Sequence, residues 1–260
     1  MRTMKAVEIA ILFCSVAAVA AFGANPSYKW TGGAGPVASG DYAGTYLWSD
    51  ANNWVNTDTS ANEVPVAGAT GSGKCTVLDF TDLAANATIT FDSATQYILG
   101  SMTFGADKGT QTLSMAAAAT GYVSSMENGT TITVPSGTTV DFRLKKPQNT
   151  NGSGASHTFT GGGTFRISSA TFSAYRVRYA IAANTTLELN SSTADFRTAY
   201  VSFDAATARL ALGADAKIGA IVGSTEAAPG QIELNGHTLE YGMSAGAWAT
   251  TSSYGWLKSA

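Results

Sequence analysis

The side chains of this sequence that could do chemistry are few, and the most suggestive are pairs two positions apart on strand-like segments. Asp141 and Arg143 form one pair, and Arg176 and Arg178 form another. Side chains at i and i+2 of a strand point to the same face. A carboxylate beside an arginine suits the acid–base chemistry of a polysaccharide lyase or hydrolase, and paired arginines could hold an acidic polysaccharide. We favour the plainer interpretation, that both pairs keep an exposed face soluble.

Metal ligation has weak support. The two histidines, His157 and His237, are far apart in the chain, and no Cys-x-x-Cys or His-x-His motif accompanies them. We expect both to be solvated turn residues. Asp50, Asn52 and Asn53 offer the hard oxygen atoms that Ca²⁺ prefers, but their spacing matches no regular calcium loop. The sequence therefore predicts no metal ion and no cofactor.

A glycine-rich segment has the outline of a nucleotide-binding loop. Residues 68–74 (GATGSGK) match the Gly-x-x-x-x-Gly-Lys part of a phosphate loop, but Cys75 stands where the magnesium-binding Ser or Thr belongs. No apolar strand precedes the segment and no helical pattern follows it, so we interpret it as a turn. Cys75 begins a strand-like run, where a small buried thiol is the expected role. We therefore assign no catalytic residue.

Aromatic residues are concentrated near the N-terminus. The group comprises Trp30, Tyr42, Tyr46, Trp48 and Trp54. Such rings could form a platform on which a sugar stacks, or they could pack together and cover the end of a core, because each buries a large apolar area. We favour packing and expect Trp48 and Trp54 to be buried, while the sugar platform stays an alternative.

The elements that must position these residues are strands. After residue 23 no segment shows a convincing helical period, and short alternating runs recur between turns rich in Gly, Asn, Pro and Ser. We therefore expect more than roughly 40% strand, above the usual fraction of about 20–25%. The clearest runs are residues 87–91, 130–134, 138–144, 164–168, 185–189, 208–212 and 231–234.

A β-sandwich and a β-solenoid both fit short strands with tight turns, and internal similarity favours the solenoid. Residues 134–140 (VPSGTTV) resemble residues 181–187 (IAANTTL): in both, a strand ends in a small-residue turn and Thr-Thr begins the next strand. Stacked coils produce such weak repeats. We predict an all-β, parallel β-helix-like solenoid.

Composition narrows the function classes. Only 13% of the 260 residues are charged, against about 25% in an average chain, and the net charge is −3. No basic patch is large enough to bind a run of nucleic-acid phosphates. Residues 1–23 read as a cleaved secretory signal peptide, with two early bases and an apolar run over residues 9–22. We expect a secreted or cell-surface protein with no membrane span in the mature chain.

Several motifs carry a family resemblance. Residues 30–33 (WTGG), 47–54 (LWSDANNW) and 63–65 (EVP) resemble the mature start of exported bacterial proteins with autotransporter-associated β-strand repeats. Residues 159–167 (FTGGGTFRI) and 230–239 (GQIELNGHTL) are similar to strands and turns of that family. The resemblance implies a passenger-type β-helix displayed outside the cell.

These observations predict three regions: a signal peptide at 1–23, a Trp/Gly-rich cap at 24–70 and solenoid repeats at 71–260. We expect the repeats to be truncated at the C-terminal end, which would then self-associate. The expected function is that of a non-enzymatic structural or adhesin-type protein. A carbohydrate-binding module that uses the Trp/Tyr block, and a polysaccharide lyase or hydrolase, remain alternatives.

Overall fold

The computed structural model of the protein describes residues 25–66, 76–146, 155–174, 177–222 and 229–241. About half of the described residues lie in strands, in line with the strand-rich pattern of alternating runs. The helical segment in the described ranges is one 3₁₀ turn, η1 (Ala51–Asn53), and no helix there is long and apolar enough to cross a membrane. The predicted signal peptide, the glycine-rich segment 68–74 with Cys75, and residues 242–260 lie outside the described residues.

The strands form two sheets. The first has eleven strands, ordered β19-β17-β15-β13-β11-β9-β6-β4-β1-β3 with β8 beside β6. Its strands are β1 (Ser27–Trp30), β3 (Trp54–Asn56), β4 (Thr76–Phe80), β6 (Gln96–Phe104), β8 (Tyr122–Met126), β9 (Thr130–Thr133), β11 (Ala155–Thr160), β13 (Val177–Ile181), β15 (Phe196–Phe203), β17 (Ala216–Val222) and β19 (Leu239–Tyr241).

The second sheet has eight strands, ordered β18-β16-β14-β12-β10-β7-β5-β2. Its strands are β2 (Tyr46–Leu47), β5 (Thr88–Phe91), β7 (Gly109–Met115), β10 (Thr138–Phe142), β12 (Thr164–Ile167), β14 (Thr186–Leu189), β16 (Arg209–Leu212) and β18 (Gln231–Glu233).

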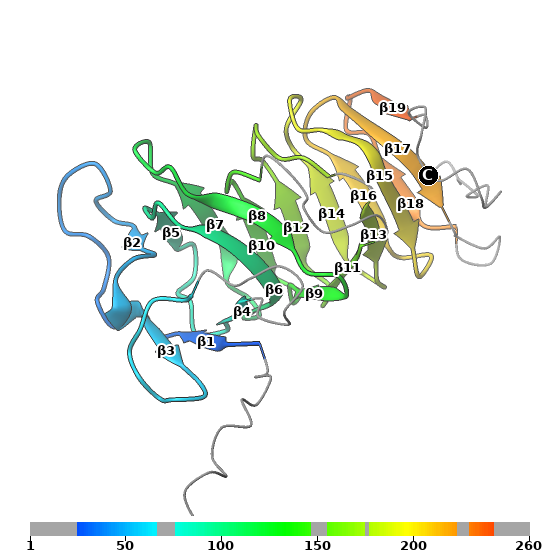
Figure 1. The fold of residues 1–260 in the computed structure, drawn as a ribbon. Helices are drawn as coiled ribbons and strands as arrows, with labels where there is room; N and C mark the ends of the chain where they lie inside the picture. The colour runs from blue at the N-terminus through cyan, green and yellow to red at the C-terminus, as the bar shows by residue number, and fades with distance from the viewer. Residues whose placement is uncertain (1–24, 67–75, 147–154, 175–176, 223–228, 242–260) are drawn as a thin grey trace, which may run out of the picture.

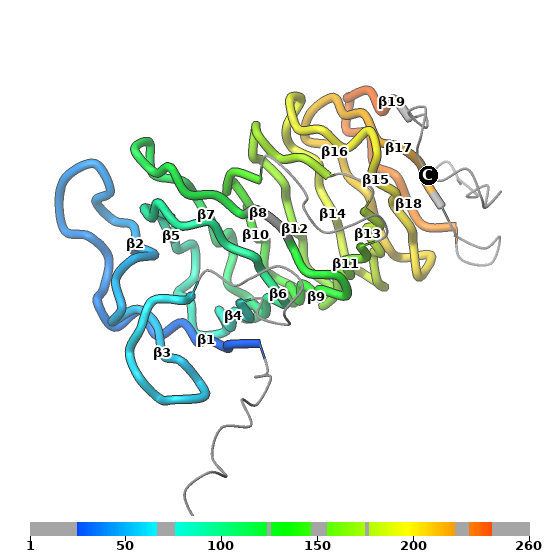
Figure 2. The backbone as a smooth tube through the Cα atoms, viewed as in Figure 1, coloured from blue at the N-terminus to red at the C-terminus, as the bar shows by residue number. Residues whose placement is uncertain are grey.

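The chain winds as a parallel β-solenoid of about six turns. From β9 onward, successive strands alternate between the two sheets, and each strand pairs in parallel with a strand of the next coil. Among the named strands, only β1 and β3 pair antiparallel. Figure 1 shows the strands advancing along one axis from β1 to β19, and the tube in Figure 2 traces the coils. The predicted solenoid is confirmed, and the sandwich alternative is excluded.

The core lies between the two sheets, because strand side chains alternate in direction. Along the eight-stranded sheet, Val140, Phe165, Leu187 and Leu210 align in register. All four are buried. Each coil therefore contributes an apolar rung to one continuous interior, and the residues between these positions point outward.

The Thr-Thr turns noted in the sequence have the same structure in different coils. Gly137 and Asn184 each adopt a positive φ, 72° and 59°, which glycine and asparagine tolerate best. The threonine that follows, Thr138 or Thr185, points inward and hydrogen-bonds to the backbone of the preceding coil, through contacts of 2.7 and 3.1 Å. Stacked turns therefore explain the repeat.

Candidate functional site: the polar face of the eight-stranded sheet

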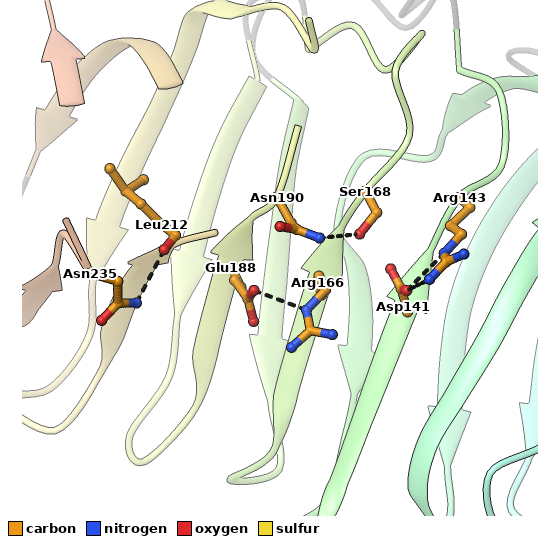
Figure 3. Close-up of polar contacts among 8 residues, drawn as sticks. All are labelled: Asp141, Arg143, Arg166, Ser168, Glu188, Asn190, Leu212 and Asn235. Atoms are coloured by element: carbon orange, nitrogen blue, oxygen red, sulfur yellow. Dashed lines mark hydrogen bonds and ion pairs between the residues drawn. The ribbon is translucent and has the colours of Figure 1, made fainter. Parts of the chain in front are cut away.

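The outer face of the eight-stranded sheet gathers polar side chains from successive coils. Register places Asp141 of β10 beside Arg166 of β12, which lies beside Glu188 of β14. In the close-up these side chains lie in one row across the strands, with Arg143 next to Asp141 (Figure 3). A parallel sheet spaces such neighbours at about 4.7–4.9 Å, so the row is a regular ladder.

The charges of this row pair with one another. Nη2 and Nε of Arg143 lie 2.6 and 2.8 Å from one carboxylate oxygen of Asp141, and Nε of Arg166 lies 2.9 Å from Glu188. The sequence prediction that Asp141 and Arg143 share a face is therefore confirmed. Asp141 is almost fully buried, whereas Arg143 is exposed. The guanidinium covers the carboxylate from the solvent side.

The row that lies two positions further along the strands begins with Arg143 and continues with neutral groups. The side-chain amide of Asn190 donates to the Ser168 hydroxyl at 2.9 Å, and that of Asn235 donates to the Leu212 carbonyl at 3.1 Å (Figure 3). On the other side of the charged row, Thr139, Thr164 and Thr186 align in register.

The threonine ladder is the part of this face with spare bonding capacity. The hydroxyls of Thr139, Thr164 and Thr186 make no hydrogen bond within the described residues, and the three side chains are partly exposed. A hydroxyl can both donate and accept. The face can therefore offer a row of neutral donors and acceptors to a ligand, while its charges are already paired.

The Asp141–Arg143 pair makes a testable contribution to stability. We expect Arg143→Met to lower the free energy of unfolding by about 1–3 kcal/mol, because it leaves a buried carboxylate without its partner. The double variant Asp141→Thr/Arg143→Thr extends the threonine pattern and should restore most of that loss. Urea denaturation measures both, and equal losses in the two variants would contradict the prediction.

The N-terminal aromatic residues lie apart from this face, at the β1 end of the core. Trp30, Trp48 and Trp54 are each 0–1% exposed, so the predicted burial of Trp48 and Trp54 is confirmed. Their rings meet mostly edge to face, with Trp54 at 4.8 Å from Trp30 and 4.9 Å from Trp48. The Trp54 indole N–H donates to the Trp48 carbonyl at 2.9 Å.

A sugar-stacking platform needs an accessible ring face. The three indoles offer none in this arrangement, whereas Tyr42 and Tyr46 are partly exposed and pack against the core from its edge. The Tyr46 ring stands edge-on to Trp30 at 5.5 Å. A sugar role for the block stays a prediction, and the two tyrosines are the members that a ligand could reach.

The expectation that His157 is a solvated turn residue is wrong. It is the third residue of β11, where alternation points it inward with Ala155 and Phe159, and it is fully buried. The polar, loop-like sequence before His157 made it look like a turn residue, so its inward position in the alternation of β11 was not recognised. His237 does follow a turn, is partly exposed, and lies 3.6 Å from Asp215, as expected for a turn residue.

Two of the three possible calcium ligands, Asp50 and Asn53, use their side chains to bond to backbone groups. Asp50 accepts a hydrogen bond from the Asn52 amide at 3.0 Å and caps η1. Asn53 is buried, and its side chain bonds to the Leu47 carbonyl and the Ala34 amide. Among the described residues, no group of three His, Cys, Asp or Glu side chains could hold a metal ion.

The two arginine-containing motifs are not brought together. Arg178 lies on β13 in the eleven-stranded sheet, where its Nε donates to the Ser202 hydroxyl at 2.9 Å and its guanidinium lies 3.8 Å from Asp204. Asp141 lies on the other sheet. Arg176 lies outside the described residues. The arginine side chain that register does place beside Asp141 is Arg166.

No protein-family model, no curated protein and no solved structure matches this chain. Its function is therefore inferred from its own residues. Sequence reasoning missed Arg166, Glu188 and Asn190 as members of the ladder. Aligning the strand-like runs 138–144, 164–168 and 185–189 on their Thr residues would have found Arg166 and Glu188, since their outward positions then coincide, and Asn190 directly follows the third run.

Proposed function

We propose that the protein is a non-enzymatic, exported solenoid of adhesin type, and that the polar face of the eight-stranded sheet is the surface it presents. The observation that carries this proposal is the ladder itself: charges paired along one row, beside threonine hydroxyls that remain free. A catalytic carboxylate must exchange protons with substrate, whereas Asp141 is buried and held by Arg143.

The export part of the proposal comes from residues 1–23, whose composition is that of a secretory signal. The resemblance to autotransporter-associated repeats supports the same destination. A fold of stacked coils also suits display, because each added coil lengthens the presented face without changing its chemistry.

The partner that suits this face is a neutral glycan. Rows of uncharged hydroxyl and amide groups can exchange hydrogen bonds with sugar hydroxyls, and a face whose charges are internally paired gives no strong attraction to a polyanion. Glycan binding through Tyr42 and Tyr46 at the N-terminal end is the second candidate, because these two rings are accessible.

A glycan array with the purified protein tests the proposal. We expect retention on neutral polysaccharides that falls at least tenfold in Thr164→Lys/Thr186→Lys, since the long cations disrupt the hydroxyl row. Tyr42→Ala/Tyr46→Ala is the matched control and should bind as the wild type does. Loss of binding only in the tyrosine variant would move the site to the N-terminal end. Release of new chain ends from an acidic polysaccharide, abolished by Asp141→Asn, would show an enzyme instead.

A further inference from the structure

Adjacent coils of the solenoid place ionisable side chains together in the apolar interior. Lys146 and His157 are 0% exposed, and the Tyr179 side chain, 1% exposed, lies beside His157 in register. The ring centroids of His157 and Tyr179 are 5.9 Å apart. Among the buried side chains of the described residues, Lys146 and His157 are the only bases.

The hydrogen bonds of this cluster are incomplete. Neither imidazole nitrogen of His157 nor the hydroxyl of Tyr179 has a partner of normal geometry within the described residues. Lys146 Nζ donates to the Ser173 carbonyl at 2.7 Å and lies 5.0 Å from the centre of the Phe172 ring. An ammonium has three donors, and no ion pair in the described part of the chain involves Lys146.

The neighbours of His157 cannot neutralise a charge on it. It packs between β9 and β13, where the groups that influence it are Lys146, a cation of the same sign, Tyr179, which is neutral, and the backbone carbonyl of Glu127. The Glu127 side chain is partly buried and has one carboxylate oxygen without a partner. A buried cation without a paired anion strongly disfavours the folded state.

We propose that Lys146, His157 and Tyr179 form an acid-sensitive point in the core, at which protonation of His157 opens the two adjacent coils that contain β11 and β13 while the coils nearer the N-terminus stay closed. Local opening of one unit is a common response of proteins to a weak region. Opening would expose the apolar inner faces of β11 and β13 outside the cell as the surroundings acidify.

The direction of the pH effect follows from burial. Burial lowers the pKa of His157 to about 3, assisted by the Lys146 charge, against an ordinary value of 6.5. The opened chain therefore binds this proton first, and stability is lost progressively as the pH falls from 6.5 towards 3. Burial also lowers the pKa of Lys146 from 10.5 to about 7, so most of its part of the loss is complete before the histidine effect begins.

Hydrogen exchange at pH 7.5 and 5.0, corrected for the intrinsic rate, tests the proposal. We expect the protection of residues 155–181 to fall by up to about thirtyfold at pH 5.0, because each pH unit below 6.5 changes the opening equilibrium up to tenfold. Residues 27–30 and 76–80 should keep their protection. The chosen window lies above the range in which surface carboxylates such as Asp82 and Asp195 titrate, since their ion pairs lower their pKa values.

Two variants decide the origin of the effect. His157→Phe should remove most of the pH-dependent opening, whereas His237→Gln, which changes the partly exposed histidine, should leave it intact. Equal protection at both pH values in the wild type, or an undiminished effect in His157→Phe, would overturn the proposal. If His157→Phe does not fold, a wild-type NMR titration replaces it: an imidazole still neutral at pH 4.5 in the folded molecules supports the proposal, and ordinary titration near pH 6.5 refutes it.

Discussion

Replacing Trp54 with alanine is expected to lower the free energy of unfolding by about 3–5 kcal/mol, the usual cost of emptying a buried large aromatic site. The indole is 0% exposed, lies within 5 Å of two other indoles by ring centroid, and contacts Phe80 at 5.6 Å. The substitution also leaves the Trp48 carbonyl without the indole N–H that bonds to it. The cavity would lie where the β1 end of the core is closed.

Equilibrium urea denaturation measures this loss, and Trp54→Phe provides the graded comparison. Phenylalanine keeps most of the packing and loses only the N–H donor and part of the ring, so we expect a loss of about 1–2 kcal/mol. A loss below about 1 kcal/mol in the alanine variant would mean that the three indoles do not form a shared core. Their burial would then have little energetic consequence.

The second large effect is expected at Gly161, in the Gly-Gly-Gly segment that follows β11. Its φ is +106°, and a Cβ there would lie 2.6 Å from the Val134 carbonyl oxygen of the preceding coil. We expect Gly161→Ala to destabilise the fold by about 3 kcal/mol, because backbone strain of about 1–3 kcal/mol adds to overpacking of similar size.

Gly129 is the matched control for this substitution. It also has a positive φ, +78°, but a Cβ there would meet nothing within 4 Å. Gly129→Ala should therefore lower the free energy of unfolding only by the strain of a positive φ, about 1 kcal/mol. The difference between the two losses in free energy of unfolding measures the effect of the close approach of adjacent coils at Gly161. Equal losses in the two variants would contradict the view that this close approach requires glycine there.

The alternating runs predicted most of the fold, because alternation with period two indicates which face of a strand is buried. The segment 164–168 (TFRIS) places Phe165 and Ile167 inward and Arg166 outward, as the pattern indicates. The Thr-Thr turns likewise revealed stacked coils, because the same backbone conformation recurs where the same residues recur. Neither signal needs knowledge of which strands are neighbours.

His157 shows where sequence reasoning stops. Its position after a Gly/Ser-rich stretch suggests a solvated turn, yet it lies in phase with Phe159 inside β11 and is buried. Lys146 gave no sequence signal either, since a lysine after a strand is usually exposed. They come near each other because side chains of adjacent coils meet in the interior, which no local pattern encodes.

The sequence alone determined the strand-rich character, the winding into parallel coils, the burial of the N-terminal indoles and the shared face of Asp141 and Arg143. These properties depend on residues close together in the chain. Only the tertiary structure decided that Arg166 and Glu188 continue the row from Asp141 and that Arg178 lies on the other sheet. It also decided that Lys146 is buried in the interior near His157. For the row from Asp141 the reason is register: residues 22 or more positions apart become neighbours only when each coil's length is set by its turns.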